Sequence, residues 1–497
     1  MTDSQVSHDL LVIGGGVNGA GIAADAAGRG LDVVLCEKSD LASATSSSSS
    51  KLIHGGLRYL EFYEFSLVRK ALRERDVLAM AAPHIIRPMA FQIPQLPHSR
   101  NALLIRAGLF LYDNLARRQR FKHSSSIRFD RDGPLNAVIS KGFEYWDAQV
   151  DDSRLVVLNA LQARQHGASI LTRTECTAIS PEEGGWQVTL HDHLKGLDSI
   201  RSFRAIVNAS GPWVASLLEG LTHKPAPHRI RLVKGSHIVV PKIHDGEHAY
   251  LLQHHDGRVV FVIPYLEQYS LIGTTEKEFQ GELDRVEIST DEISYLISIV
   301  NLYFKKSILH SDIVNTYSGV RPLIDQQGKS ASKISREYRL ELSLDPSPLL
   351  SVYGGKVTTY RVLSEHVMNK LGRCFPGMGS AWTGQARLPG GDFDLPENLF
   401  NRLATRYRWL GPDMINRWLA SYGTLSFDIL GDARGLDDLG MKFGNNLYQR
   451  EVDYLCREEW ARTAEDILWR RSKLGYQFDE KQTTSLSNYL KQSYPIN

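Results

Sequence analysis

A short glycine-rich segment near the N-terminus constrains the fold of this chain more than any other feature. Residues 14–19 read Gly-Gly-Gly-Val-Asn-Gly, which fits the pattern G-x-G-x-x-G. An apolar stretch before it, Asp9 to Ile13, predicts a buried strand. The alanine-rich stretch from Ala20 to Arg29 predicts a helix that ends at Gly30, and Leu31 to Leu35 predict a second strand. This order is typical of the Rossmann-type dinucleotide-binding unit.

Each glycine of the motif has its own physical role. Gly14 permits the tight turn from strand to helix, Gly16 lets the backbone approach a pyrophosphate, and Gly19 allows the helix to pack closely on the strand. The helix N-terminus offers free N–H groups to phosphate oxygens. Glu37 lies about 20 residues further on and can accept hydrogen bonds from ribose hydroxyls. The segment therefore predicts a bound dinucleotide, and a glycine-rich turn without a ligand is the alternative.

A run of small hydroxyl residues follows the second predicted strand. Residues 42–50 read Ala-Ser-Ala-Thr-Ser-Ser-Ser-Ser-Ser, and a serine run alone is typical of a flexible linker. Its position beside the expected cofactor favours another interpretation. Small side chains and glycines there would let backbone N–H groups approach phosphates and a flat ring.

From this point the sequence resembles the FAD-dependent glycerol-3-phosphate dehydrogenases, most of all the bacterial aerobic, quinone-linked type. Residues 49–61, Ser-Ser-Lys-Leu-Ile-His-Gly-Gly-Leu-Arg-Tyr-Leu-Glu, carry the first match. Similar segments recur along the whole chain, at residues 142–152, 207–213, 234–237, 272–275, 317–322, 354–361 and 458–471. The resemblance implies non-covalent FAD and oxidation of sn-glycerol 3-phosphate to dihydroxyacetone phosphate by hydride transfer to flavin N5. It also implies a homodimer on the cytoplasmic face of the bacterial inner membrane that passes electrons to membrane quinone.

The resemblance implies an α/β plus α+β architecture in which two domains interleave. The expected FAD-binding core comprises residues 1–80, 145–222 and 315–386, and the antiparallel-sheet substrate cap comprises 81–144 and 223–314. The residues Pro389-Gly390-Gly391 and Pro396 predict a linker, and a helical C-terminal domain, 387–497, is expected around them. Shorter predictions are strands at 207–209, 238–240, 259–264 and 349–353, and a helix capped by Thr358 or Thr359 that runs to Leu371.

The expected cofactor-binding residues come from the glycine motif, the serine run and the later matching segments. They are Gly14, Gly16, Gly19, Glu37, Thr45, Ser46, Ser50, Lys51, His54, Gly55, Ser210, Gly211, Gly355, Lys356, Val357 and Thr358.

A phosphorylated substrate needs cations, and arginine matches phosphate oxygens with its planar fork. The expected substrate-binding residues are Arg58, Tyr59, Arg321, Arg336 and Lys356. Arg321 and Lys356 are also expected to act in catalysis, since Lys356 would stabilise charge on the reduced flavin. The alternatives are structural ion pairs for the arginines and a solvated lysine at the start of a helix.

A base must take the proton of the substrate hydroxyl, and histidine titrates near working pH. His237 is the first candidate, although the chain has 17 histidines and a packed strand histidine is the alternative. His54 is the second candidate, and it could instead shape the flavin pocket. After Gly273-Thr274-Thr275 the family pattern leads us to expect aspartate, whereas Glu276 stands there. The role of this acid is therefore left open.

Composition and charge exclude several other classes of protein. A net charge of +2 gives no reason to expect a nucleic-acid partner. The four cysteines, Cys36, Cys176, Cys374 and Cys456, show no CxxC spacing, so neither a metal site nor a disulfide framework is expected. The polar N-terminus and these separated cysteines favour a cytoplasmic setting.

One segment suggests contact with an anionic membrane surface. Residues Ala102 to Tyr112 are apolar except for Arg106, and they lie between Arg100 and the basic residues Arg117, Arg118, Arg120 and Lys122. This stretch is too short to span a bilayer but suits an interfacial helix. A buried helix of the cap with a solvated basic end is an equally good interpretation.

Two other functions compete with the leading one. An oxidase of the same fold would pass electrons to oxygen, with glycerol phosphate or an amine or amino acid as its substrate. A non-catalytic flavin-binding redox sensor would not need the arginines or the Gly-Gly-Lys segment, and both are present. Dye reduction with glycerol 3-phosphate, glycerol, lactate and glycine would distinguish these functions.

Overall fold

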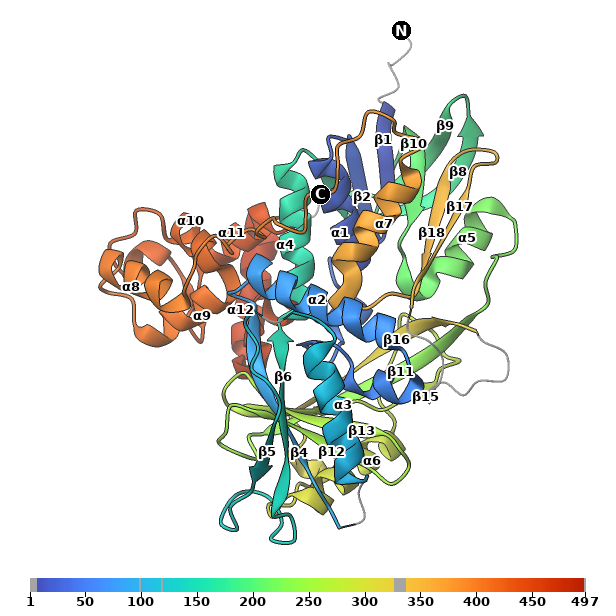
Figure 1. Ribbon diagram of the computed structural model, residues 1–497. Coiled ribbons are helices and arrows are strands. Elements are labelled where there is room, and N and C mark those ends of the chain that lie inside the picture. The colour runs from blue at the N-terminus through green and yellow to red at the C-terminus, as the bar shows by residue number, and fades with distance from the viewer. Residues whose placement is uncertain (1–6, 98–99, 118, 326–336, 496–497) are drawn as a thin grey trace.

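The computed structural model describes residues 7–97, 100–117, 119–325 and 337–495. Figure 1 shows two sheet-containing bodies, one above the other, with a group of helices from the C-terminal part of the chain at one side. Arg118 and Arg336 fall outside the described residues.

The first sheet carries the glycine motif. Its strands are hydrogen-bonded in the order β17-β18-β10-β1-β2-β7, and β8 and β9 extend it beside β10. The strands are β1 (Ser7–Ile13), β2 (Val33–Glu37), β7 (Ser169–Thr172), β8 (Thr174–Glu182), β9 (Gly185–Asp192), β10 (Leu197–Asn208), β17 (Arg339–Ser343) and β18 (Leu349–Tyr353). β18, β10, β1, β2 and β7 are parallel, as in a dinucleotide-binding sheet.

Helices cover this sheet because its central strands are apolar on both faces. Its helices are α1 (Val17–Gly28), α4 (Asp152–Gln165), α5 (Val214–Thr222) and α7 (Tyr360–Leu371). Small residues let α1 approach its neighbours, since a Cβ on Gly21 would lie 2.6 Å from the ring of Tyr360 on α7. The predicted strand–helix–strand unit is confirmed, although α1 begins at Val17, inside the glycine motif.

The second sheet follows the order β15-β11-β14-β13-β12-β4-β6-β3, with β16 beside β11 and β5 beside β6. Its strands are β3 (Leu52–Ile53), β4 (Ile86–Pro94), β5 (Ser125–Arg128), β6 (Lys141–Val150), β11 (Ile230–Pro241), β12 (Ala249–Gln253), β13 (Val259–Tyr265), β14 (Tyr269–Gly273), β15 (Lys277–Glu278) and β16 (Asn315–Ile324). The sheet is antiparallel except between β4 and β12. The expected domain boundaries at residues 145 and 315 would assign β16 and part of β6 to the FAD-binding core. In the structure both strands pair within the second sheet.

Alternate residues of the second sheet face opposite layers. Ile238 and Val240 pack toward α6 (Thr290–Tyr303), whereas Val239 packs toward α3 (Ala102–Asn114). This alternation is the period-two pattern of a sheet covered on both faces. Helix α2 (Phe65–Ala81) then connects the two bodies, as Figure 1 shows.

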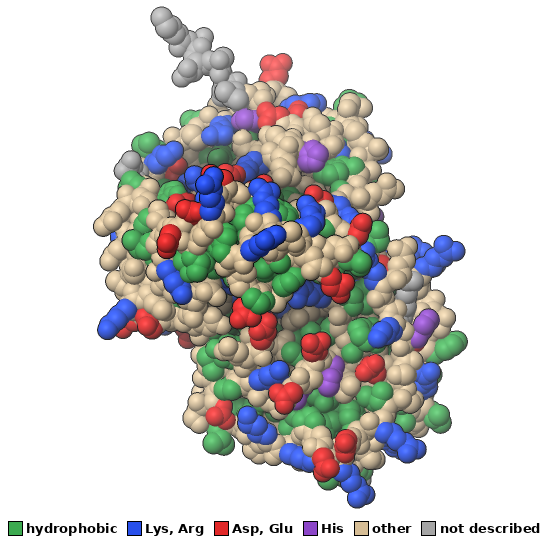
Figure 2. All heavy atoms as spheres, turned by 90° about the vertical axis from the view of Figure 1, so that its left-hand side faces the viewer, with side chains coloured by type: hydrophobic (Ala, Val, Ile, Leu, Met, Phe, Trp, Pro, Cys, Tyr) green, Lys and Arg blue, Asp and Glu red, His purple; other side chains and the backbone are tan. Residues whose placement is uncertain are grey.

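The C-terminal part forms its own apolar core, and its helical character is as expected. Its helices are α8 (Pro396–Arg406), α9 (Pro412–Tyr422), α10 (Ser426–Leu430), α11 (Gln449–Glu458) and α12 (Glu480–Ser493), with a π-helical turn at Asp466–Arg471 and a small hairpin of β19 (Lys442–Gly444) and β20 (Leu447–Tyr448). Of the predicted linker, Pro389, Gly390 and Gly391 are buried and Pro396 is exposed. A Cβ on Gly390 would lie 2.2 Å from the carbonyl oxygen of Tyr422. Figure 2 faces these helices and shows basic and acidic side chains interspersed over their outer surface.

Candidate active site

A cavity of about 830 Å³ is lined by residues of both large sheets and of the loops that join them. The cavity runs along the glycine motif, the loop after β2 and the N-terminal end of α7. Residues of β11, β13 and β16 from the second sheet line the far end. A single cavity therefore joins a dinucleotide-binding end to a chemically different end.

The dinucleotide end is narrow because of its glycines. Gly14 has φ +113°, and a Cβ there would lie 2.7 Å from the carbonyl oxygen of Ala209. A Cβ on Gly19 would lie 1.9 Å from the carbonyl oxygen of Gly14, so Gly19 lets α1 pack against the turn and does not itself line the cavity. Gly16 lines the cavity at the N-cap of α1, where the free N–H groups of the helix point.

Glu37 stands at the end of β2 beside this turn. Its Oε2 accepts a hydrogen bond of 2.6 Å from the N–H of Gly15, and its Oε1 accepts one of 2.8 Å from the N–H of Ser39. Burial raises the pKa of this carboxyl against the lowering effect of the two N–H groups. A carboxylate has about four acceptor sites, so Glu37 keeps capacity for ribose hydroxyls.

The segment between β2 and β3, residues 38–51, is named here the serine loop, and it wraps one side of the cavity. Ser46 Oγ accepts a hydrogen bond of 3.0 Å from the N–H of Val17 at the start of α1. Thr45 Oγ1 donates to the carbonyl of Val320 at 2.8 Å, which joins the loop to β16. Thr45, Ser46 and Ser50 line the cavity as expected. Lys51 does not, because its buried ammonium points away and pairs with Asp152 at 2.8 Å.

The N-terminal end of α7 forms the opposite wall. The cavity is lined there by Gly355, Lys356, Val357 and Thr358. It is also lined by Ser210 and Gly211, which follow β10. Gly355 has φ +110°, and a Cβ there would lie 2.7 Å from Nδ2 of Asn18. Thr359 is the N-cap residue of α7, but neither it nor Thr358 makes the expected side-chain cap; Thr358 Oγ1 donates instead to the carbonyl of His54 at 3.3 Å. The expected cofactor residue Gly55 lies behind the wall, against Tyr112.

Three cationic side chains meet at the far end of the cavity. Arg58 pairs with Glu276 at 3.3 Å, and Arg321 lies 3.8 Å from the same carboxylate. The ammonium of Lys356 lies 4.0 Å from the centre of the Tyr59 ring. All five side chains line the cavity. The expected substrate residue Arg336 lies outside the described residues.

The two candidate histidines lie at different depths. His54 lines the cavity, and burial, with Lys356 and Arg321 nearby, lowers its pKa to about 3. His237 is 1% exposed and lies behind the wall. Its Nε2 is 2.9 Å from Oγ of Ser50, and its ring stacks on Tyr317. Burial, Arg321 and Lys51 lower the pKa of His237 well below its ordinary value. Both rings are therefore neutral at pH 7.

Several lining residues were not predicted from the sequence. Leu251, Phe261 and Tyr145 come from strands of the second sheet, and Asn18 lies inside the glycine motif. The strand residues alternate like their buried neighbours, so only the three-dimensional structure distinguishes them. Asn18 could have been noticed, since it is the one polar side chain in residues 14–19.

The residues that line the cavity are suited to bind FAD. The glycines leave room for a pyrophosphate, helix N–H groups face it, and Glu37 stands where a ribose would lie. A family model described as "FAD dependent oxidoreductase" matches residues 9–361, and one described as "C-terminal domain of alpha-glycerophosphate oxidase" matches residues 381–489.

Curated relatives match nearly the full chain. A glycerol-3-phosphate dehydrogenase of Pseudomonas aeruginosa is 52% identical over 98% of this chain and 96% of its own length. The aerobic glycerol-3-phosphate dehydrogenase of Escherichia coli is 48% identical over 97% of each chain. A D-erythritol 1-phosphate dehydrogenase of Brucella abortus is also 48% identical, over 94% of each.

A solved structure agrees on the fold. The glycerol-3-phosphate dehydrogenase of Bacillus halodurans, complexed with FAD, superimposes with a TM-score of 0.74 at 24% identity, covering 100% of this chain and 96% of the other. The chain therefore belongs to the family of FAD-dependent oxidoreductases that includes these bacterial glycerol-3-phosphate dehydrogenases.

Proposed function

We propose that this protein oxidises sn-glycerol 3-phosphate to dihydroxyacetone phosphate and passes the electrons to membrane quinone. The observation that carries the proposal is the meeting of Arg58, Arg321 and Lys356 at one end of the FAD cavity. A phosphate dianion is the substrate group that such a cluster suits. The names of the relatives point to the same substrate class.

The cations would hold the substrate phosphate and so fix the position of the reacting carbon. Arginine can bind two phosphate oxygens at once, which sets orientation as well as affinity. Lys356 can bond substrate, or offset negative charge on the reduced cofactor, from its place at the start of α7. Bound FAD would supply the acceptor for the hydride that leaves the carbon bearing the reacting hydroxyl.

The proton of that hydroxyl needs an acceptor in the wall of the cavity. We assign this role to the pair of Ser50 and His237, in which Ser50 lines the cavity and His237 Nε2 is 2.9 Å from its hydroxyl. A neutral histidine can accept a proton that a serine hydroxyl relays. His54 lines the cavity directly and is the second candidate.

Quinone lies in lipid, and α3 offers a surface that suits a membrane. One face of α3 packs on the second sheet through Ile105, Leu109 and Tyr112. The other face exposes Leu103 at 80% and Phe110 at 62%, along with Leu104 and Leu111. Exposed Arg117 and Arg120 follow this helix. The buried-helix and the interfacial-helix interpretations of this segment are therefore compatible: one side of α3 packs on the second sheet, and the other side is free to enter a membrane interface.

None of the helices in the described part of the chain has both the length and the apolarity to cross a bilayer. We infer peripheral attachment through α3 at the cytoplasmic face of the inner membrane, with the enzyme acting as a homodimer.

Dye reduction by the purified, FAD-loaded protein tests the proposal. Glycerol 3-phosphate should be the best substrate in a panel with D-erythritol 1-phosphate, glycerol, lactate and glycine. Quinone in vesicles should accept electrons much faster than oxygen does. A preference for glycine would favour an amino-acid oxidase, rapid oxygen use would favour a glycerol-phosphate oxidase, and no turnover with any substrate would favour a redox sensor.

A further inference from the structure

In the part of the chain that the structure describes, the C-terminal domain supplies no side chain to the wall of the FAD cavity, yet it contacts the loop that forms that wall. Among the described residues, those that line the cavity all precede residue 359. The π-helical turn Asp466–Arg471 and the next two residues nevertheless reach across to the serine loop and to the start of α4. The helical domain is therefore placed to act on the cofactor from outside.

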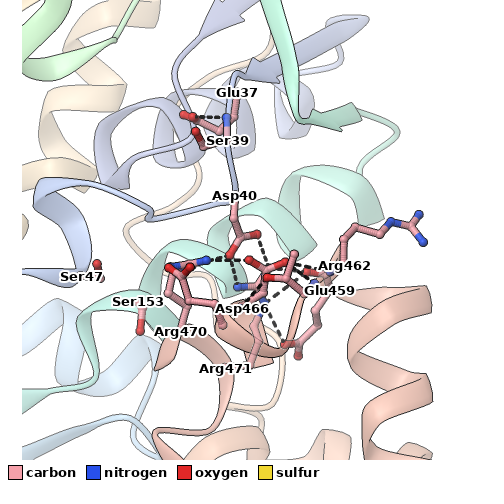
Figure 3. A network of polar contacts seen from close by, with 12 residues as sticks. Glu37, Ser39, Asp40, Ser47, Ser153, Glu459, Arg462, Asp466, Arg470 and Arg471 are labelled. Atoms are coloured by element: carbon pink, nitrogen blue, oxygen red, sulfur yellow. Dashed lines mark hydrogen bonds and ion pairs between the residues drawn. The ribbon is translucent and has the colours of Figure 1, made fainter. Parts of the chain in front are cut away.

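The first contact is made at the beginning of the serine loop. Figure 3 shows Arg470 and Arg471 pointing at the carboxylate of Asp40, three residues after Glu37. Arg471 donates to both carboxylate oxygens at 2.8 Å, and Arg470 Nε donates to Oδ2 at 2.6 Å. Asp40 and Arg471 are almost completely buried. A buried carboxylate with two arginines fixes the backbone that carries it more firmly than a solvated pair.

The arginines are in turn held by their own domain and by α4. The carbonyl of Glu459 accepts from Arg471 Nη2 at 2.7 Å, and the Glu459 carboxylate accepts from Arg154 Nη2 at 2.9 Å. Asp466 accepts from Arg470 at 2.6 Å and from the N–H of Arg462 at 2.8 Å. Figure 3 shows Glu459, Arg462 and Asp466 gathered with the two arginines around Asp40.

The second contact supports the end of the loop. Lys473 donates to Asp151 at 3.0 Å and also bonds Ser153, both at the start of α4. Between these residues stands Asp152, whose two oxygens accept from Lys51 at 2.8 Å and from the hydroxyl of Ser49 at 2.7 Å. Lys51 also donates to the carbonyl of Ser47 at 2.9 Å. The same C-terminal segment thus fixes the loop at Asp40 and, through α4, at Ser49 and Lys51.

The loop backbone shows why such support is needed. Ala42 has φ +59° and Lys51 has φ +56°, which is the left-handed region that side-chain-bearing residues rarely adopt. These two residues lie near the two supported ends, and all the residues between them except Ser47 line the cavity. A loop with unfavourable backbone at both ends keeps its shape only where surrounding contacts hold it.

We propose that Arg471, with Arg470 and Lys473, is a positioning residue for FAD: the C-terminal domain holds the serine loop in its cofactor-binding shape through Asp40 and Asp151. This inference rests on FAD occupying the cavity, and the wild-type titration below checks that separately. None of these three side chains lines the cavity, so their effect should be on affinity and not on the chemical step.

The test compares FAD affinity with stability in matched variants. Apoprotein is titrated with FAD by flavin fluorescence, and melting temperatures are measured with and without FAD. Arg471→Lys and the isosteric Asp40→Asn should each raise the Kd for FAD by about tenfold or more. They should also reduce the rise in melting temperature that FAD gives. Arg471→Met should raise the Kd for FAD more than Arg471→Lys does. The double variant Arg471→Lys with Asp40→Asn should have a Kd no higher than that of the single variant that binds FAD more weakly.

The control is Arg417→Lys, which alters a half-buried arginine paired with Glu451 inside the same domain. It should lower both melting temperatures alike and leave the Kd unchanged. If Arg471→Lys behaves like this control, the contact is only structural and the proposal is overturned. If Arg471→Lys does not fold, Asp40→Asn decides alone, and a wild-type Kd in that variant overturns the proposal. A wild-type protein that binds no FAD would instead refute the cofactor assignment.

Discussion

The guanidinium of Arg58 and the carboxylate of Glu276 form an ion pair of 3.3 Å in the wall of the FAD cavity, and Arg321 lies 3.8 Å from the same carboxylate. The acid whose role the sequence left open thus stands between two of the cations assigned to the phosphate. It can hold both guanidinium groups in place, and it also offsets part of their charge. A phosphate dianion near these cations would experience repulsion from it.

Glu276→Gln should therefore strengthen the binding of inorganic phosphate as a competitive inhibitor. Removal of the negative charge should lower the inhibition constant by about tenfold, or about 1.4 kcal/mol. The amide still accepts one hydrogen bond from an arginine, so the cluster should keep its shape. Glu278→Gln, two residues away on the surface and paired with Arg231, is the control. An unchanged inhibition constant in Glu276→Gln would place the phosphate elsewhere.

Arg321→Ala should reduce kcat/KM for glycerol 3-phosphate by about 150-fold, which is a loss of about 3 kcal/mol in transition-state stabilisation. This value is the upper range for a hydrogen bond to a charged group. The loss for unphosphorylated glycerol, if it turns over slowly, should be much smaller. Steady-state dye reduction with both substrates measures the difference. Arg231→Ala on the same β11–β16 side of the sheet should have little effect, because Arg231 does not line the cavity. Equal losses for both substrates would show that Arg321 does not bind the phosphate.

His237→Asn should lower kcat by about 100-fold or more, the usual contribution of a general base. His54→Asn should reduce kcat less than His237→Asn does. If the serine hydroxyl relays the proton, the reduction of kcat in Ser50→Ala should lie between those of the two histidine variants. Because the pKa of His237 lies well below its ordinary value, this base should be protonated only in acid. Rates measured from pH 8 down to pH 4 would show whether the fall of kcat in acid disappears in the His237 variant. The reverse order of the two histidines would transfer the role of base to His54.

The sequence was sufficient for the parts of the site in which local geometry determines function. The turn of Gly14, Gly16 and Gly19 needs particular residues at particular spacing, and the structure has the same turn. The buried position of Lys51 could not be inferred, because a lysine in a serine run gives no hint of a buried partner such as Asp152, 101 residues away. The boundaries near residues 145 and 315 failed for the same reason: the pairing of β6 and β16 is a long-range property.

The linker at Pro389-Gly390-Gly391 shows a further limit. Proline and glycine predict a turn correctly, but they do not say whether the turn is exposed. Here it packs against the ends of α2 and α9, where only glycine leaves room for the backbone of Ala81 and Tyr422. The contact of Arg471 with Asp40, 431 positions apart, could not have been inferred from sequence either.

Stability should fall with acid because of His84, which is 1% exposed beside Gly390 and Gly423. Burial, with Arg154 and Arg87, lowers the pKa of His84 to about 3 in the folded state. The unfolded chain, with an ordinary pKa near 6.5, binds this proton first as the pH falls. His84 therefore favours unfolding progressively from about pH 6.5 down to about pH 3, by about 2 kcal/mol at pH 5 relative to pH 7.

Urea unfolding of the wild type and of His84→Gln at pH 7 and pH 5 measures this contribution. The variant should lose less free energy of unfolding between the two pH values than the wild type does. His223→Gln, at an exposed position, is the control. The same loss in wild type and His84→Gln would show that His84 is not the acid-sensitive group.

The exposed face of α3 should govern attachment to membranes. Replacement of Leu103, Leu104 and Phe110 with serine should abolish co-sedimentation with anionic liposomes, since each large apolar side chain contributes about 2 kcal/mol when fully buried. Arg117→Glu with Arg120→Glu should weaken binding by about 1 kcal/mol per residue, and added salt should act in the same direction. Dye activity should persist in both variants while quinone activity in vesicles falls.

The control is serine at Leu302 and Leu309, which are exposed apolar residues of the same cap away from α3. It should leave sedimentation unchanged. Loss of binding in the control alone would move the membrane contact to that surface.

Anaerobic titration of the FAD-loaded protein with glycerol 3-phosphate asks whether this substrate reduces the flavin. The absorbance of oxidised flavin should disappear with about one equivalent of substrate, and glycerol at the same concentration should leave it unchanged. The reduced protein should then be reoxidised rapidly by quinone and slowly by oxygen. If flavin that dithionite reduces stays oxidised in the presence of excess glycerol 3-phosphate, this protein is not a glycerol-3-phosphate dehydrogenase.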